Sequence, residues 1–184
     1  LSAACHEHGL KLFVDGARLA YALTSPANDV SMADLARLSD VFYIGGTKCG
    51  TLFGEAVVIP DGGSIRQFVT QMKQHGALLA KGRLLGVQFE ALFEDDLYST
   101  IGQPGVAATT RIREALIRAG YVVTMDSPTN LTFVALDQAG HERLSRKVQY
   151  GIWETLPDGR LLARFCTSWG TPEEDIKAFE AALA

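Results

Sequence analysis

Two short apolar runs, each of which delivers a charged residue into a turn, constrain the fold of this chain most strongly. The run 12–14 ends on Asp15, and the run 41–44 precedes a Gly-Gly-Thr-Lys turn that ends on Lys48. Continuous apolar runs of this kind are typical of buried strands in a parallel sheet. Because open α/β sheets bind ligands at the carboxyl ends of their strands, we expect Asp15 and Lys48 to lie at one ligand site.

A carboxylate and a lysine at one sheet edge suit pyridoxal 5'-phosphate (PLP). This cofactor needs a lysine for its aldehyde and an acid for its pyridine nitrogen. Lys48 is therefore the candidate catalytic lysine, which would bond to PLP and later move protons as a free amine. The alternative is a surface lysine after a strand. Asp15 is the candidate partner of the ring nitrogen, and the alternative is a helix cap, for which Asp is favoured.

Four segments in order resemble the threonine aldolase and aromatic amino acid β-eliminating lyase family of fold-type-I PLP enzymes. They are His-Gly-Leu at 8–10 leading into Asp-Gly-Ala-Arg-Leu at 15–19, Gly-Gly-Thr-Lys-Cys-Gly at 45–50, Lys-Gly-Arg-Leu-Leu-Gly-Val-Gln-Phe at 81–89, and Ala-Arg-Phe-Cys-Thr-Ser-Trp at 163–169. Within the family the resemblance is closest to the low-specificity L-threonine aldolases, and it covers nearly the whole chain.

The resemblance implies an α/β chain with the PLP-dependent transferase fold of type I. Residues 1–105 would form part of the large PLP-binding domain, with a mainly parallel sheet. Residues 106–184 would form a small C-terminal α+β domain, in agreement with the change in composition after the long helix predicted near 100–119.

The resemblance also implies a reaction, the cleavage of threonine or allo-threonine to glycine and an aldehyde. The phosphate-binding loop, the residue that stacks on the ring and the catalytic base would belong to an N-terminal half that this sequence lacks. By itself the chain is therefore expected to be a poor enzyme. The family further implies a homodimer or homotetramer that binds a small amino acid substrate.

Three more residues receive roles from the resemblance. Arg18 would hold the ring oxygen or the substrate, and the alternative is a solvated arginine at a helix start. Thr47 would donate its hydroxyl to the phosphate, or else bond to its own backbone as turn hydroxyls do. Arg164 would bind the α-carboxylate of the substrate, because a guanidinium forms two parallel bonds with a carboxylate. The alternative is an arginine that faces water from an alternating strand.

Apolar runs predict the strands, and caps, glycines and prolines bound the predicted helices. The predicted strands are 10–14, 41–44, 55–59, 121–123, 131–136 and 161–165. In the first part of the chain we predict the end of a helix in 1–10, a turn or short helix in 18–23, and a helix that begins with a Ser31 and Asp34 capping box and runs to 38. The later predicted helices are 64–93 with a break near 75–76, one that begins at 95 or 100 and ends at 119, 141–150, and 172–184.

The bulk properties exclude some classes of function. A net charge of −4 gives no electrostatic footprint for nucleic acid or an anionic membrane. No apolar run reaches the roughly 18–20 residues that a membrane helix needs. The three cysteines lack the spacing of a disulfide framework or a metal site. We therefore expect no bound metal, and we expect the protein in the reducing cytoplasm.

Two alternatives to threonine cleavage stay open. The first is another PLP reaction, such as β-elimination or transamination, because PLP supplies the electron sink and the residues around the substrate choose the bond. The second is a truncated, non-catalytic paralogue kept for subunit association.

Overall fold

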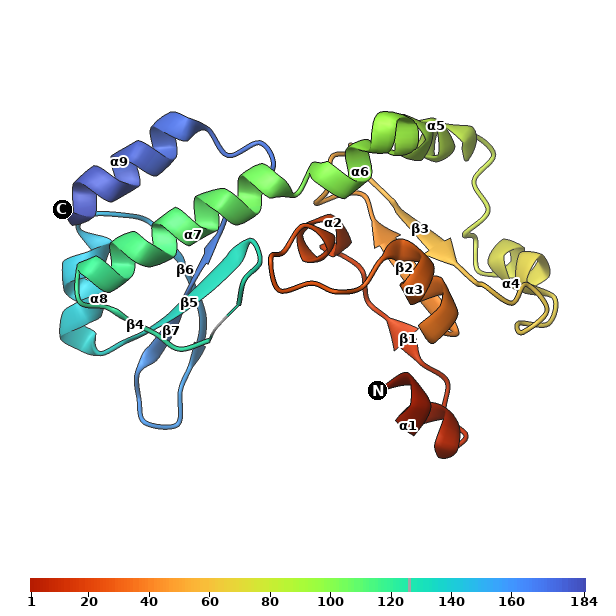
Figure 1. Cartoon of the computed structure of the whole chain (residues 1–184), viewed down its shortest axis with the longest axis horizontal. Helices are drawn as coiled ribbons and strands as arrows, with labels where there is room; N and C mark the ends of the chain where they lie inside the picture. Colours follow the sequence, from red (N-terminus) through yellow and green to blue (C-terminus); the bar gives the residue numbers. More distant parts are fainter. Residues whose placement is uncertain (126) are drawn as a thin grey trace. The chain divides into compact units, whose positions relative to one another are not determined.

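The computed structural model describes residues 1–125 and 127–184 and divides them into two compact units (Figure 1). Unit 1 comprises Leu1–Leu23 and Asp29–Thr100, and unit 2 comprises Thr24–Asn28 and Ile101–Ala184. The division therefore falls at residues 100 and 101. The assignment of 1–105 to a cofactor-binding domain and of 106–184 to a small domain stays a prediction.

Unit 1 contains a three-stranded sheet in the order β1-β2-β3. The strands are β1 (Phe13–Val14), β2 (Val41–Gly45) and β3 (Glu55–Val58). β1 pairs with β2 in parallel, and β3 pairs with β2 antiparallel. The helices of unit 1 are α1 (Ser2–Glu7), α2 (Leu19–Leu23), α3 (Met32–Leu38), α4 (Phe68–Gln74), α5 (Arg83–Phe93), the 3-10 turn η1 (Glu94–Asp96) and α6 (Leu97–Thr100).

Side-chain hydrogen bonds fix two points in unit 1: the start of α3 and the alignment of β2 with β1. The Ser31 hydroxyl accepts a bond from the Asp34 backbone N–H at 3.1 Å, and the Asp34 carboxylate accepts one from the Ser31 N–H at 3.1 Å. After α3, Asp40 accepts a bond from the Leu12 N–H at 2.8 Å, just before β1. The capping box predicted from the sequence is confirmed, and Asp40 aligns the start of β2 with β1.

The two predicted buried strands of unit 1 differ in outcome. In β2, Phe42 and Ile44 are buried as expected. The strand predicted over 10–14 is only the two-residue β1, and the expectation that it is buried is wrong for Phe13, which is 59% exposed. The reason is that β1 is the edge of the described sheet and pairs only with β2.

Unit 2 contains a four-stranded antiparallel sheet in the order β4-β5-β7-β6. The strands are β4 (Val122–Val123), β5 (Leu131–Leu136), β6 (Gly151–Thr155) and β7 (Leu161–Cys166), and the helices are α7 (Gln103–Arg118), α8 (Gln138–Ser145) and α9 (Glu173–Leu183). The sequence predicted the other strands but missed β6. The helix predicted over 141–150 lies earlier, because Asp137 caps α8 by accepting a bond from the Gly140 N–H at 2.6 Å.

α7 and α9 lie against one face of this sheet (Figure 1). The core between them is made of fully or almost fully buried side chains: Leu116, Val134, Leu136, Leu144 and Ala163. On the rim, Arg111 of α7 bonds Glu180 and Glu173 of α9 at 2.6–3.0 Å. Because successive side chains of a strand point to opposite faces, Ala163 and Phe165 of β7 face this core and Arg164 faces away from it.

Candidate active site

Two glycines let the ends of β1 and β2 come unusually close. A Cβ on Gly16 would lie 1.8 Å from the Tyr43 carbonyl oxygen, and one on Gly45 would lie 2.5 Å from the Ala17 carbonyl oxygen. The Gly45 N–H also donates to the Gly16 carbonyl at 2.9 Å. Both glycines are buried against the protein's own backbone.

Asp15 follows β1 and is held by two hydrogen bonds to the same oxygen. Its Oδ1 accepts from the Ala17 N–H at 3.0 Å and from the Tyr43 hydroxyl. These bonds, the one from Tyr43 foremost, lower the pKa of Asp15, and the positive charges of Lys48 and Arg18 add to the effect. Asp15 is not a helix cap, because α2 begins only at Leu19.

Lys48 lies exposed in the turn after β2. Its backbone carbonyl accepts a bond from the buried hydroxyl of Tyr21 at 2.7 Å, which fixes the turn to α2. The turn is also held by Glu55, whose carboxylate accepts from the Gly46 N–H at 2.6 Å. Within the described part of the chain, the Lys48 ammonium makes no hydrogen bond or ion pair, so its amine is available.

Thr47 and Cys49 flank the lysine and are tied to the protein. The Thr47 hydroxyl oxygen accepts from the Gly54 N–H at 3.0 Å and lies 3.4 Å from the Gly54 carbonyl. This is the backbone bonding that the sequence offered as the alternative to phosphate binding. Cys49 is fully buried, as a packing residue should be, and burial raises the pKa of its thiol.

Unit 1 thus brings four of the predicted site residues to one end of its sheet: Asp15, Arg18, Thr47 and Lys48. Among the described contacts, the Arg18 guanidinium has no hydrogen-bond or ion-pair partner. The sequence reasoning missed Tyr43, which it treated as one more apolar strand residue. The available signal was alternation, because Tyr43 lies between the buried Phe42 and Ile44 and a tyrosine hydroxyl needs a partner.

Arg164 lies in unit 2, on the sheet face opposite the helices. Its guanidinium carbon sits 4.7 Å from the ring centroid of Trp153. Trp153 in turn packs edge-on against Phe133, at a centroid distance of 6.1 Å. Among described residues the guanidinium has no carboxylate or hydrogen-bond acceptor as partner. Arg164 is therefore half-buried on an aromatic platform, with its N–H groups unpaired.

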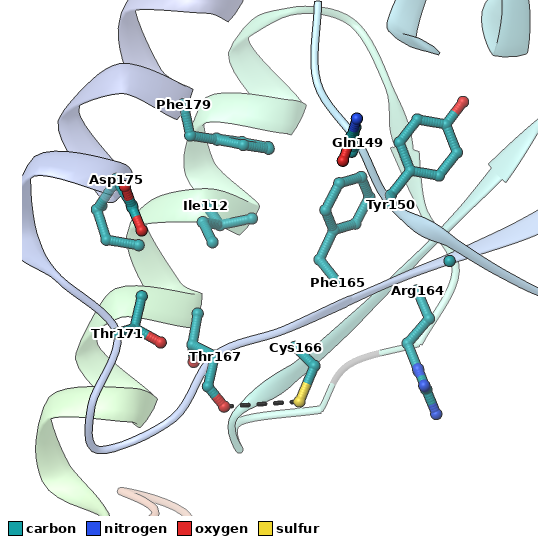
Figure 2. Close-up of a pocket in the computed structure, with 12 residues that line it drawn as sticks. Ile112, Gln149, Tyr150, Arg164, Phe165, Cys166, Thr167, Thr171, Asp175 and Phe179 are labelled. Atoms are coloured by element: carbon teal, nitrogen blue, oxygen red, sulfur yellow. Dashed lines mark hydrogen bonds between the residues drawn. The ribbon is translucent and has the colours of Figure 1, made fainter.

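A pocket of about 380 Å³ lies on the helix side of the same strand (Figure 2). Aromatic contacts line it, with Phe165 5.3 Å from Tyr150 and 5.6 Å from Phe179 between centroids. In Figure 2 the guanidinium of Arg164 points away from these rings. Arg164 is itself one of the residues that line the pocket, and its role in binding a carboxylate stays a prediction.

Comparison with known proteins places the chain in a family. A family model described as beta-eliminating lyase matches residues 1–149. The chain belongs to the beta-eliminating lyase family, whose model covers most of its length.

In the described residues no helix is long and apolar enough to cross a membrane.

The relatives include low specificity L-threonine aldolases. The one from Pseudomonas aeruginosa is 29% identical over 182 residues, which cover 96% of this chain and 51% of the relative. One from another Pseudomonas species is 27% identical over 188 residues, covering 100% of this chain and 52% of the relative. The chain thus spans about half the length of the curated relatives it matches.

Solved structures confirm the fold class. A Leishmania major threonine aldolase superposes with a TM-score of 0.91 at 42% identity, over 99% of this chain and 53% of that one. A Sphingomonas wittichii serine palmitoyltransferase has a TM-score of 0.67 at 16% identity, over 98% of this chain and 49% of that one, and shows the fold alone. The chain therefore has the α/β fold of type I PLP enzymes, and the resemblance seen in its motifs is confirmed.

Proposed function

We propose that the protein is a PLP-dependent lyase that cleaves β-hydroxy-α-amino acids, threonine and allo-threonine among them, to glycine and an aldehyde. The observation that carries this proposal is an ionised Asp15 beside an unpaired Lys48 at the ends of two paired strands. The family and the names of the relatives support the same reaction.

The residues present fit PLP. Asp15 has a lowered pKa, and within the described residues its Oδ2 accepts no hydrogen bond, so an ionised oxygen is free for a pyridine N–H. In the part of the chain that the structure describes, no acid is paired with Lys48. When bound, PLP supplies the electron sink that accepts the electrons of the broken carbon–carbon bond.

The chain's own residues would hold the cofactor and move protons. Asp15 would keep the proton on the pyridine nitrogen, and Lys48 would bind the aldehyde carbon and then carry a proton as a free amine. The Thr47 hydroxyl already accepts from the Gly54 N–H at 3.0 Å and donates to the Gly54 carbonyl at 3.4 Å, and it would have to give up this longer bond to donate to the phosphate. Phosphate binding by Thr47 is therefore the weakest of the proposed roles.

The two unpaired arginines are proposed for the substrate. Arg164 would bind the α-carboxylate through two parallel hydrogen bonds, since its N–H groups have no partner among the described residues and its guanidinium carbon lies 4.7 Å from the ring centroid of Trp153. Arg18, whose charge acts on Asp15, would hold the ring oxygen or the substrate. We further propose that the protein acts in the cytoplasm as a homodimer or homotetramer.

β-Elimination is the second candidate, because the matching family is described as beta-eliminating lyase. The two reactions leave different products. Retro-aldol cleavage of threonine releases glycine and an aldehyde, whereas β-elimination releases a keto acid and ammonia. Product analysis on one substrate series therefore separates them.

The test is covalent labelling with PLP and borohydride, on purified protein that also contains the N-terminal half implied by the family resemblance. We expect reduction to fix the cofactor on Lys48, located by peptide mass spectrometry, and Lys48→Ala to abolish both the label and glycine release from threonine. Lys81→Ala, which changes an exposed lysine of the same unit, is the matched control and should keep both. A Lys48→Ala protein labelled at unchanged stoichiometry would show that another lysine holds the cofactor.

A further inference from the structure

Tyr43 contacts the acid that the proposed function assigns to the pyridine nitrogen. The Tyr43 hydroxyl donates to Oδ1 of Asp15, and the Ala17 N–H donates to the same oxygen at 3.0 Å. Both bonds therefore occupy one side of the carboxylate. In the described part of the chain Oδ2 is left as the unbonded acceptor.

We infer that Tyr43 is a positioning residue, which orients Asp15 so that Oδ2 faces the pyridine nitrogen of PLP and keeps that carboxylate ionised. The inference rests on the proposed PLP site. It adds a residue that acts through Asp15, without contact between Tyr43 and the substrate.

The sheet register brings the two residues level. β1 and β2 run parallel with Val14 opposite Phe42, so the next position on each strand places Asp15 beside Tyr43. The Tyr43 carbonyl lies against Gly16, where an added Cβ would be 1.8 Å away. The backbone of Tyr43 therefore lies close against the segment that carries Asp15.

The backbone of Tyr43 is anchored in β2, where its strand neighbours Phe42 and Ile44 are buried. Its ring makes a peripheral contact with the exposed Phe13, at 6.0 Å between centroids. A side chain anchored on a strand loses little further freedom when it donates a hydrogen bond, so it can hold a carboxylate oxygen in one orientation.

The charges around the pair favour a neutral tyrosine that donates to an ionised aspartate. The hydrogen bond from Tyr43 is the largest cause that lowers the pKa of Asp15, followed by the Ala17 N–H and the charges of Lys48 and Arg18. The same bond is the largest cause that raises the pKa of Tyr43 to about 12, and burial and the charges of Asp15 and Glu55 add to the rise. Near neutral pH the tyrosine therefore keeps its proton.

The test compares Tyr43→Phe with the unchanged protein, because phenylalanine keeps the ring and removes only the hydroxyl. In the PLP-free protein we expect the pKa of Asp15, followed by carboxyl carbon NMR, to rise toward its ordinary value. We expect PLP to bind about tenfold more weakly, as the loss of one hydrogen bond to a charged group predicts. The loss should grow as the pH falls, because more of the variant's Asp15 is then protonated.

A double-mutant cycle separates positioning from a general structural effect. In an Asp15→Asn background, the further change Tyr43→Phe should alter PLP affinity much less than it does alone. Phe13→Leu, which removes the ring contact and keeps the hydroxyl, is the matched control and should leave the pKa of Asp15 low. Equal losses of affinity in both backgrounds, or an unchanged pKa of Asp15 in Tyr43→Phe, would overturn the inference.

Failure of the proposed function gives a different result. If the unchanged protein does not bind PLP while Tyr43→Phe still raises the pKa of Asp15, the cofactor assignment is wrong and the coupling of the two side chains stands. If the unchanged protein binds PLP and Tyr43→Phe changes neither affinity nor pKa, the cofactor assignment stands and the role of Tyr43 is wrong.

Discussion

The two units hold their candidate site residues by different means. Unit 2 places Arg164 on a four-stranded sheet whose other face is closed by α7 and α9, and an aromatic platform fixes its guanidinium. Unit 1 places Asp15 and Lys48 on turns fixed by backbone contact and hydrogen bonds to Tyr43 and Glu55. In unit 1, close contact between backbone segments can therefore hold Asp15 and Lys48 in place at the ends of their strands, although side-chain packing there is less complete than in unit 2.

The difference also appears in what each unit leaves exposed. Unit 1 exposes large apolar side chains, each to more than half of its area: Leu10, Phe13, Leu52, Val57, Val69, Leu79 and Leu84. Unit 2 also exposes Ile117, Val122 and Trp153 to more than half, but it buries a continuous core that includes Leu116 and Leu144 at 0% exposure. Stability is therefore expected to depend on unit 2's core far more than on the apolar surface of unit 1.

The largest expected effect tests this contrast in packing. Leu116→Ala should lower the free energy of unfolding by about 2–5 kcal/mol, because it opens a cavity in a core that cannot fully collapse. Leu79→Ala, at a side chain that is 54% exposed, should stay within about 0.5 kcal/mol. Denaturant unfolding measures both. A large loss for Leu79→Ala would mean that the exposed apolar surface of unit 1 is packed in solution.

The next effect concerns charge in unit 1. Asp15→Asn should lower turnover on threonine by on the order of 10²-fold or more, because a neutral amide no longer stabilises the pyridinium charge. The fold should survive, since the amide oxygen can still accept from Tyr43 and Ala17. Asp61→Asn, an exposed turn residue of the same unit, serves as the control in steady-state kinetics. Unchanged turnover of Asp15→Asn would leave Asp15 a purely structural turn residue.

A smaller effect is expected for substrate binding in unit 2. Arg164→Lys keeps the charge but loses the planar fork, so KM for the amino acid should rise by a factor that corresponds to about 1–3 kcal/mol. PLP affinity should not change. Arg160→Lys, at an arginine paired with Asp158, is the control. A drop in PLP affinity at constant KM would assign Arg164 to the cofactor instead.

The smallest effect sharpens the role of the aromatic platform. Trp153→Leu removes the ring under Arg164 and should raise KM by a few-fold, or about 0.5–1 kcal/mol, the usual strength of an exposed cation–π contact. Trp153→Phe should restore part of the loss, and Ile152→Ala, at the neighbouring exposed side chain, should leave KM unchanged. If Trp153→Leu and Ile152→Ala behave alike, the stack does not position Arg164.

The sequence by itself determined the elements whose signals are local. The capping box of α3, the apolar run of β2 and the glycine stop after α7 depend on residues a few positions apart, and each is found where predicted. The motifs around Asp15 and Lys48 likewise led to the family, because the residue types that PLP chemistry needs follow directly from the cofactor. Burial was less predictable, since Phe13 is apolar yet lies on an edge strand.

Only the tertiary structure decided the features that depend on distant partners. All five residues of β6 are exposed, so no alternation marked it, and it exists because its backbone pairs with β7. Gly16 is required by the Tyr43 carbonyl, 27 positions away in the chain. The bond between Tyr43 and Asp15 spans 28 positions. Hydrogen bonds and close backbone contacts of this kind form only after the strands have paired, which is why local sequence patterns could not reveal them.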